Sequence, residues 1–213
     1  MIDMKYEANA FIKRIDRELN DTMVFSSIIE LISDKFYPNH DDSEINTSLR
    51  DEFYKSFIEG SLTKKIIRKV IRSHDFECWA EWNLQSTIDE FLKELTFKNG
   101  KLSIYRAITT NYDWIKVSTL SKKLKLGECW SYTYTGAIPY YGNVNDKNHY
   151  IFIGEISPRD IDWYHTILFN LSESYSHEKE IRLFSNRTIK NFRVEKKGEL
   201  FVYQFNYKKK IKS

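Results

Sequence analysis

The chain has 213 residues, the length of one domain or of one domain with a distinct subdomain. Its 41% hydrophobic and 15% aromatic content argues against a disordered chain. The 33 basic and 30 acidic residues nearly balance at a net charge of +3, which gives no global sign of nucleic-acid binding but leaves room for a local basic groove.

The sequence also argues against metal, disulfide and membrane-spanning classes. Cys78 and Cys129 are too few for a zinc site or a disulfide framework. No apolar run approaches the ~18 residues of a membrane span. The opening MIDMKYEANAF lacks the basic and apolar segments of a signal peptide. These features predict a cytoplasmic protein with reduced thiols and no membrane partner.

The first half of the chain has the periodicity of helices. Apolar residues recur at helical spacing in five stretches, at residues 11–19, 25–36, 53–58, 66–71 and 88–95. Pro38 ends the second stretch, and NGK at 99–101 predicts a turn. We therefore expect a helical N-terminal subdomain over residues 1–98.

The pattern becomes that of strands from residue 99 onward. KLSIYRAIT (101–109) and CWSYTYT (129–135) alternate, and HYIFIGEIS (149–157) is nearly continuously apolar, as in a strand covered on both faces. EIRLFS (180–185) predicts another strand, and residues 188–207 predict a hairpin with Gly198 in its turn. Helices followed by strands indicate an α+β fold, with residues 99–213 as the β-rich core.

Side-chain direction within these strands selects the candidate site residues. Arg106 shares a strand face with Ile104 and Ile108, so its guanidinium is expected to lose water and to need a carboxylate or phosphate partner. A buried Arg–Glu pair is the alternative that strand geometry alone favours.

The strand at 129–135 divides into two faces. Its small hydroxyl residues share one face, which is expected to line a polar cleft, and its aromatic residues share the other, which is expected to be core. A half-exposed strand is the simpler alternative, because threonine is common in strands. The hydroxyl residues are Ser131, Thr133 and Thr135, and the aromatic residues are Trp130, Tyr132 and Tyr134.

Two glutamates form the third candidate feature. Glu178 and Glu180 share a face if the strand has begun by residue 178, and neighbouring carboxylates raise each other's pKa. Two interpretations stay open. The glutamates are either a pair with divided catalytic roles or two solvent-exposed residues at the start of a strand.

This ordered set resembles the R-S-E class of mono-ADP-ribosyltransferases, which are NAD-using toxins and effectors. The matching residues are Arg106 in IYRAIT, Ser131 with Thr133 in WSYT, and Glu178 with Glu180 in HEKEIRL. LGECWSYTYTGAIPYYG resembles the segment that holds a Gly, the S-T-S strand and a short helix. The bulky residue between Ser131 and Thr133 departs from the family pattern. Over about residues 100–207, the resemblance implies an ADP-ribosyltransferase-like mixed β-sheet core, with NAD as substrate and no metal.

The resemblance also implies a role for each residue. Glu180 would stabilise the oxocarbenium-like ribose that forms when nicotinamide leaves. Ser131 would bind Glu180 or the ribose, with support from Thr133, and Arg106 would grip a phosphate of NAD. Glu178 would orient or deprotonate the acceptor.

Two tyrosines complete the candidate set. Tyr175, in the loop before the glutamates, would touch the target, with an ordinary exposed loop residue as an equal alternative. Tyr141, or its neighbour Tyr140, would stack on nicotinamide, although burial in the core is the favoured alternative. His177 could act as a second base but is more simply an ordinary loop residue.

The acceptor and the partners follow only from the resemblance and from composition. RNA or DNA is favoured over protein arginine as the acceptor, because the surroundings are tyrosine-rich and mildly basic. A toxin of this kind would have a cognate antitoxin protein. Two other functions stay open: a toxin ribonuclease that uses Arg106, His177 and Glu178, and a non-catalytic protein that stacks single-stranded bases on the aromatic strand.

Overall fold

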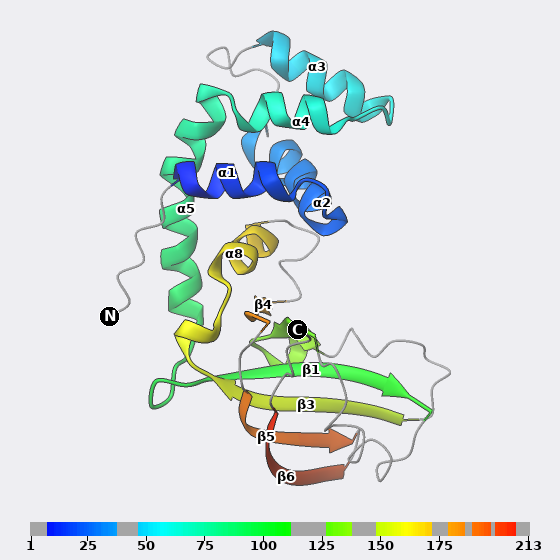
Figure 1. Ribbon diagram of the computed structural model, residues 1–213, viewed down its shortest axis with the longest axis vertical. Coiled ribbons are helices and arrows are strands. Elements are labelled where there is room, and N and C mark those ends of the chain that lie inside the picture. Colours follow the sequence, from blue (N-terminus) through cyan, green and yellow to red (C-terminus); the bar gives the residue numbers. More distant parts are fainter. Residues whose placement is uncertain are drawn as a thin grey trace, which may run out of the picture. The chain divides into compact units, whose positions relative to one another are not determined.

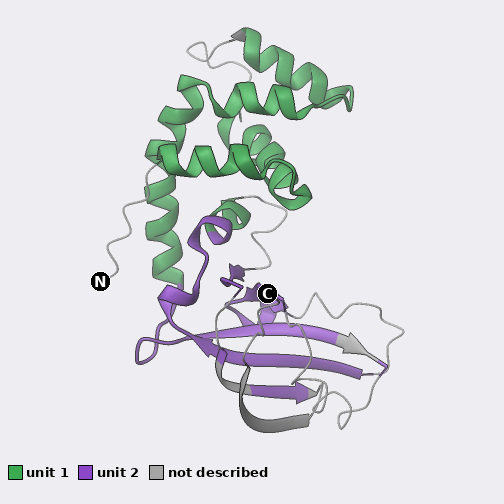
Figure 2. Ribbon diagram, in the orientation of Figure 1, with its two compact units in different colours: residues 1–94, 167–174 green, residues 95–166, 175–213 purple. Residues whose placement is uncertain are grey.

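The computed structural model describes residues 8–37, 47–111, 127–137, 148–171, 179–185, 189–196 and 199–207. The chain divides into two compact units, one of residues 1–94 with 167–174 and one of residues 95–166 with 175–213 (Figure 2). Helices come first and strands follow, which confirms the predicted α+β class.

The helical unit is built from amphipathic helices that bury one face each. They are α1 (Ala8–Glu18), α2 (Thr22–Leu31), the π-helix η1 (Ile32–Phe36), α3 (Thr47–Ile58), α4 (Lys64–Ile71) and α5 (His74–Glu94) (Figure 1). The predicted helical stretches are confirmed, but α5 begins well before residue 88. Phe76, Ala80 and Leu84 continue its buried face at a spacing of four residues.

Side-chain caps mark where two of these helices begin. Asp21 accepts hydrogen bonds from the backbone nitrogens of Met23, at 2.8 Å, and Val24, at 3.2 Å, at the start of α2. Thr63 does the same for Ile66 at the start of α4, at 3.4 Å. These caps satisfy backbone donors that a helix leaves unpaired at its first turn.

The second unit contains a six-stranded sheet of order β4-β2-β1-β3-β5-β6. The strands are β1 (Leu102–Thr110), β2 (Cys129–Ser131), β3 (Asn148–Ile156), β4 (Glu180–Arg182), β5 (Ile189–Lys196) and β6 (Glu199–Tyr207). Figure 1 shows the longer strands β1, β3 and β5 side by side. Among the residues that the structure describes, all five strand pairs are antiparallel, so the expected mixed sheet is wrong in this respect.

Three details of the sheet confirm the sequence prediction. The residues from Tyr150 to Ile153 are all buried, as expected for a strand covered on both faces. β5 and β6 pair as the expected hairpin. Before β1, Asn99 (φ 50°) and Gly100 (φ 70°) form a two-residue turn closed by hydrogen bonds of 2.8 and 2.9 Å between the backbones of Lys98 and Lys101.

Two elements were not predicted, the 3₁₀ helix η3 (Pro158–Asp160) and the helix α8 (Trp163–Leu171). A third, α7 (Tyr134–Ala137), lies after β2, where the resemblance implies a short helix. Within the described residues, no helix combines the length and the apolar character that crossing a membrane requires.

Candidate functional site

The sheet brings the strands that carry the three motifs next to one another. β2 lies between β1 and β4, although the three strands are far apart in the sequence. Ser131 pairs with Tyr105 of β1 on one side and with Glu180 of β4 on the other. Because directly opposed residues point to the same face, Ser131 and Glu180 share one face of the sheet.

The Ser131–Glu180 pair is of the close type. The backbone nitrogen of Tyr132 donates to the carbonyl of Lys179 at 2.9 Å, so the backbone bonds lie beside this pair rather than within it. In such non-hydrogen-bonded pairs the side chains approach more closely than in the alternative type. Both side chains are buried, with Glu180 only 4% exposed.

The strand β2 ends at Ser131, where two side-chain hydroxyl groups accept hydrogen bonds from the backbone that follows. Ser131 Oγ accepts a hydrogen bond from the backbone nitrogen of Thr133 at 3.1 Å and lies 3.4 Å from Thr133 Oγ1. Thr133 Oγ1 then accepts from the backbone nitrogen of Gly136 at 3.0 Å and caps α7. Such local bonds compete with the sheet ladder, so the predicted strand over 129–135 is shortened to Cys129–Ser131.

This shortening corrects the predicted division into two faces. Trp130 and Tyr132 are buried, as expected of the aromatic face. Tyr134, in contrast, lies on α7 and is 42% exposed, so its predicted place in the core is wrong. Thr135 also belongs to α7 and does not continue the hydroxyl face of β2.

Cys129 lies against Glu180 and was not singled out from the sequence. Burial is the main reason why the pKa of the Cys129 thiol is raised from 9.0 to about 12, and the negative charge of Glu180 and a hydrogen bond with it raise that pKa further. Arg182 and Arg106 act in the opposite direction through their positive charge. The thiol therefore stays protonated beside the carboxylate at neutral pH.

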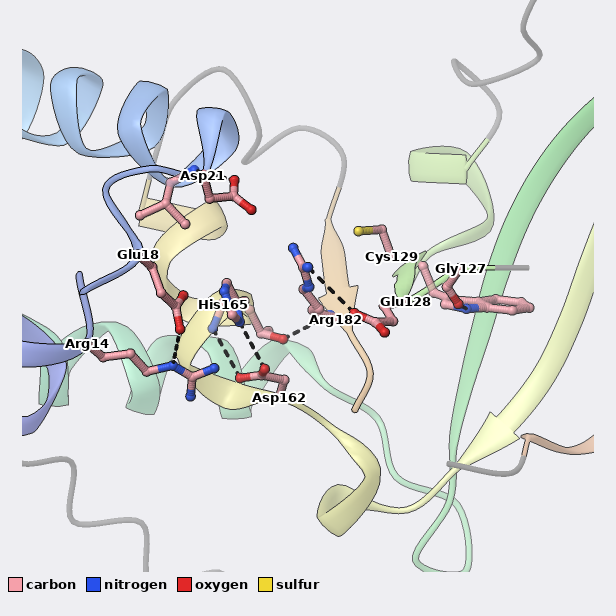
Figure 3. Close-up of polar contacts among 12 residues, drawn as sticks. Arg14, Glu18, Asp21, Gly127, Glu128, Cys129, Asp162, His165 and Arg182 are labelled. Carbon is pink, nitrogen blue, oxygen red and sulfur yellow. Dashed lines mark hydrogen bonds and ion pairs between the residues drawn. The ribbon is translucent and has the colours of Figure 1, made fainter. Parts of the chain in front are cut away.

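Arg182 forms the other end of this cluster. It pairs in register with Cys129, and its Nη2 lies 3.5 Å from Oε2 of Glu128 (Figure 3). Residues two apart on a strand share a face, so the spacing of Glu180 and Arg182 in EIRL is a sequence signal that could have identified Arg182.

Arg106 lies on β1, and its side chain projects from the sheet face opposite to that of Ser131. Its neighbour Tyr105 is the residue that pairs with Ser131, and successive side chains alternate between faces. Arg106 Nη1 donates a hydrogen bond to the backbone carbonyl of Cys129. One partner of the guanidinium is thus a backbone carbonyl at the start of β2.

Gly127 makes room for this guanidinium. A Cβ atom at residue 127 would lie 2.9 Å from Nη1 of Arg106, and the φ angle of 71° belongs to the left-handed region that glycine adopts freely. The guanidinium can therefore reach the start of β2 because residue 127 has no side chain.

Lys179 holds an uncommon backbone conformation directly before Glu180. Its φ angle is 50°, and it belongs to a turn, so β4 begins only at Glu180. Left-handed conformations outside glycine are costly and gather at functional sites.

The remaining candidates lie outside the described residues. They are Glu178, Tyr141, Tyr175, Tyr140 and His177. Comparisons with protein-family models, with curated proteins and with solved structures find no match.

Cys129 provides a first prediction. In the folded protein at pH 8, it should react with iodoacetamide about a thousandfold more slowly than in the unfolded protein, because the raised pKa leaves little thiolate. The raised pKa also predicts a loss of stability as the pH rises from 9.0 through about 12, since only the unfolded thiol ionises in that range. Mass spectrometry of the Cys129 peptide, with the urea-unfolded protein as the control, measures the rate, and equal rates would contradict this placement.

Proposed function

We propose that this chain is an NAD-dependent mono-ADP-ribosyltransferase. The observation that carries the proposal is the adjacency of the three motif strands in the order β4-β2-β1, with Ser131 directly opposite Glu180. If the similarity in sequence arose by chance, there would be no reason for these three distant segments to lie next to one another in one sheet. The short helix α7, which follows β2 directly, also agrees with the segment that the resemblance implies.

The proposed reaction needs a fixed negative charge near the ribose of NAD. The bond between the nicotinamide nitrogen and ribose C1′ breaks, and its electron pair leaves with nicotinamide. A bond then forms between C1′ and a nucleophilic atom of the acceptor, which gives up its proton. The ribose is oxocarbenium-like in the transition state, so a preorganised carboxylate stabilises it. We assign that role to Glu180.

The neighbours of Glu180 suit such a role. Ser131 stands opposite it in the sheet, and Thr133 fixes the position of the Ser131 hydroxyl through two contacts. The protonated thiol of Cys129 adds no second negative charge to the site. A carboxylate held by fixed neighbours needs little rearrangement when positive charge develops on the ribose.

Arg106 is the member of the set whose role is least direct. Its bond to the carbonyl of Cys129 gives it a structural role, because it ties β1 to the start of β2. Phosphate binding by Arg106 stays part of the proposal, since a guanidinium carries five N–H donors. The face on which Arg106 leaves β1 argues against a direct contact with the group held by Ser131 and Glu180.

The finer parts of the proposal rest on the resemblance. The β-rich unit would have an ADP-ribosyltransferase-like fold, and the protein would act in the cytoplasm as a toxin or effector with an antitoxin partner. RNA or DNA is the preferred acceptor. Tyr141 would contact nicotinamide, and Tyr175 would contact the acceptor.

A substitution of Glu178 distinguishes the two steps of the proposed reaction, cleavage of NAD and transfer to the acceptor. Glu178→Ala should reduce transfer to the acceptor about tenfold or more while reducing hydrolysis of NAD much less, because its role is to activate the acceptor. Parallel assays of label transfer and nicotinamide release measure the two rates. An equal loss of both would remove the acceptor role.

Incubation of the purified protein with labelled NAD and a cell lysate tests the proposed function. Label should appear on a macromolecule, and digestion with nuclease or protease should show which class carries it. RNA cleavage without NAD would replace the proposal with a ribonuclease. Salt-dependent RNA binding without NAD consumption would replace it with a binding protein.

A further inference from the structure

The strand that carries Glu180 is short and is held from both edges. β4 contains only Glu180, Ile181 and Arg182. On one edge it pairs with β2. On the other edge it meets the segment from residue 160 to residue 166, which sequence reasoning did not connect with the site.

Hydrogen bonds form a continuous row along this second edge. The backbone nitrogen of Phe184 donates to the carbonyl of Asp160 at 3.1 Å, and Ile161 forms a bridge with Leu183. The backbone nitrogen of Asp162 donates to the carbonyl of Arg182 at 2.7 Å. The row ends where the backbone nitrogen of Arg182 donates to Oγ1 of Thr166 at 3.0 Å.

Thr166 therefore takes the place that a strand carbonyl would normally hold. Both backbone groups of Arg182 point away from β2, and a side-chain hydroxyl satisfies the donor. Thr166 is fully buried, so water is not at hand to replace its oxygen. A buried N–H group without an acceptor is costly.

A buried pair fixes the turn on which Thr166 stands. Oδ2 of Asp162 lies 2.9 Å from Nδ1 of His165, and Oδ1 accepts from the His165 backbone nitrogen at 3.4 Å (Figure 3). The carbonyl of Asp162 also accepts from the backbone nitrogen of Thr166 at 3.0 Å. Asp162 thus caps the first turn of α8 and sets the direction of the Thr166 side chain.

We propose that Thr166 is a positioning residue that holds β4, and with it Glu180, in register for the reaction. The inference rests on the proposed function, since Glu180 matters for activity only if the chain cleaves NAD. Glu180 lies two residues from Arg182 on a strand of three residues, so loss of the Arg182 contact loosens the whole strand. Thr166 is fully buried, so we assign it no contact with the substrate.

Thr166→Val tests this role, with Thr166→Ser as the matched control. Valine has nearly the shape of threonine but no acceptor, whereas serine keeps the oxygen. Amide hydrogen exchange at Arg182 should become about tenfold faster in Thr166→Val and stay near wild type in Thr166→Ser. Exchange at the buried amides of β3 is the internal control for folding, and Thr166→Ala is the second variant if Thr166→Val does not fold.

Two further measurements connect the strand to Glu180. Alkylation of Cys129 should be faster in Thr166→Val than in Thr166→Ser, because the thiol reports on the nearby Glu180 charge. The kcat for NAD consumption should fall about tenfold in Thr166→Val with a nearly unchanged KM, because the contact acts on the position of the carboxylate rather than on binding.

The outcomes separate the two proposals. If the wild-type protein consumes NAD but Thr166→Val matches it in kcat, or if Thr166→Ser is impaired equally, the positioning role is overturned and the proposed function survives. If the wild-type protein consumes no NAD, the proposed function and the positioning role both fail, although the exchange result would still describe how Thr166 holds β4.

Discussion

Glu180→Gln is expected to reduce NAD-dependent transfer of label by about a hundredfold or more while the protein stays folded. Glutamine keeps the size of the side chain at a site where Glu180 is only 4% exposed, so the packing of β4 against β2 is preserved. What is lost is the negative charge that would stabilise the ribose in the transition state. Label transfer measures the activity, and circular dichroism measures the fold.

Glu81→Gln is the matched control for this substitution. Glu81 is an exposed residue of α5 in the helical unit, so the same chemical change there should leave transfer unaltered. Full activity in Glu180→Gln would contradict the catalytic role assigned to Glu180. Loss of activity together with loss of the fold would call for Glu180→Asp, which keeps the charge but shortens its reach.

Trp130→Ala is expected to have the largest effect on stability, about 3–5 kcal/mol less free energy of unfolding. Trp130 is 2% exposed and lies on the face of β2 opposite to Ser131. Its indole Nε1 also donates to the carbonyl of Gly127 at 3.4 Å. The substitution removes the side chain with which β2 packs into the core, and the opposite face of the same strand carries the proposed site.

Trp82→Ala is the control, because it makes the same substitution at an exposed position. Trp82 is 81% exposed on α5, and such surface changes usually alter the free energy of unfolding by less than about 0.5 kcal/mol. Urea unfolding followed by circular dichroism compares the two variants. A loss below about 1 kcal/mol in Trp130→Ala would contradict the burial of this ring.

The sequence was sufficient for the elements that depend on local patterns. Helical periodicity located the N-terminal helices, and the Asn99–Gly100 turn and the β5–β6 hairpin were predicted from turn residues and alternation. The end of β2 was harder to predict, because alternation continues through 129–135. There the hydroxyl groups of Ser131 and Thr133 form local bonds that replace the sheet ladder.

The features that could not be predicted from the sequence depend on strand register and on long-range contacts. Alternation correctly grouped Arg106 with Ile104, but only the pairing of Tyr105 with Ser131 shows that Arg106 leaves β1 on the other face. Likewise, no local pattern connects Thr166 with the backbone of Arg182. Such contacts depend on how distant segments meet in the sheet.

Release of nicotinamide from NAD by the purified protein, measured with the wild type and with Glu180→Gln, tests the central claim most directly. The claim is that β1, β2 and β4 build a site that breaks the bond between nicotinamide and ribose. It predicts that the wild type releases nicotinamide, with or without an acceptor, and that Glu180→Gln releases it about a hundredfold more slowly. No release above the enzyme-free rate by the wild type, even with cell lysate as a source of acceptor, would contradict it.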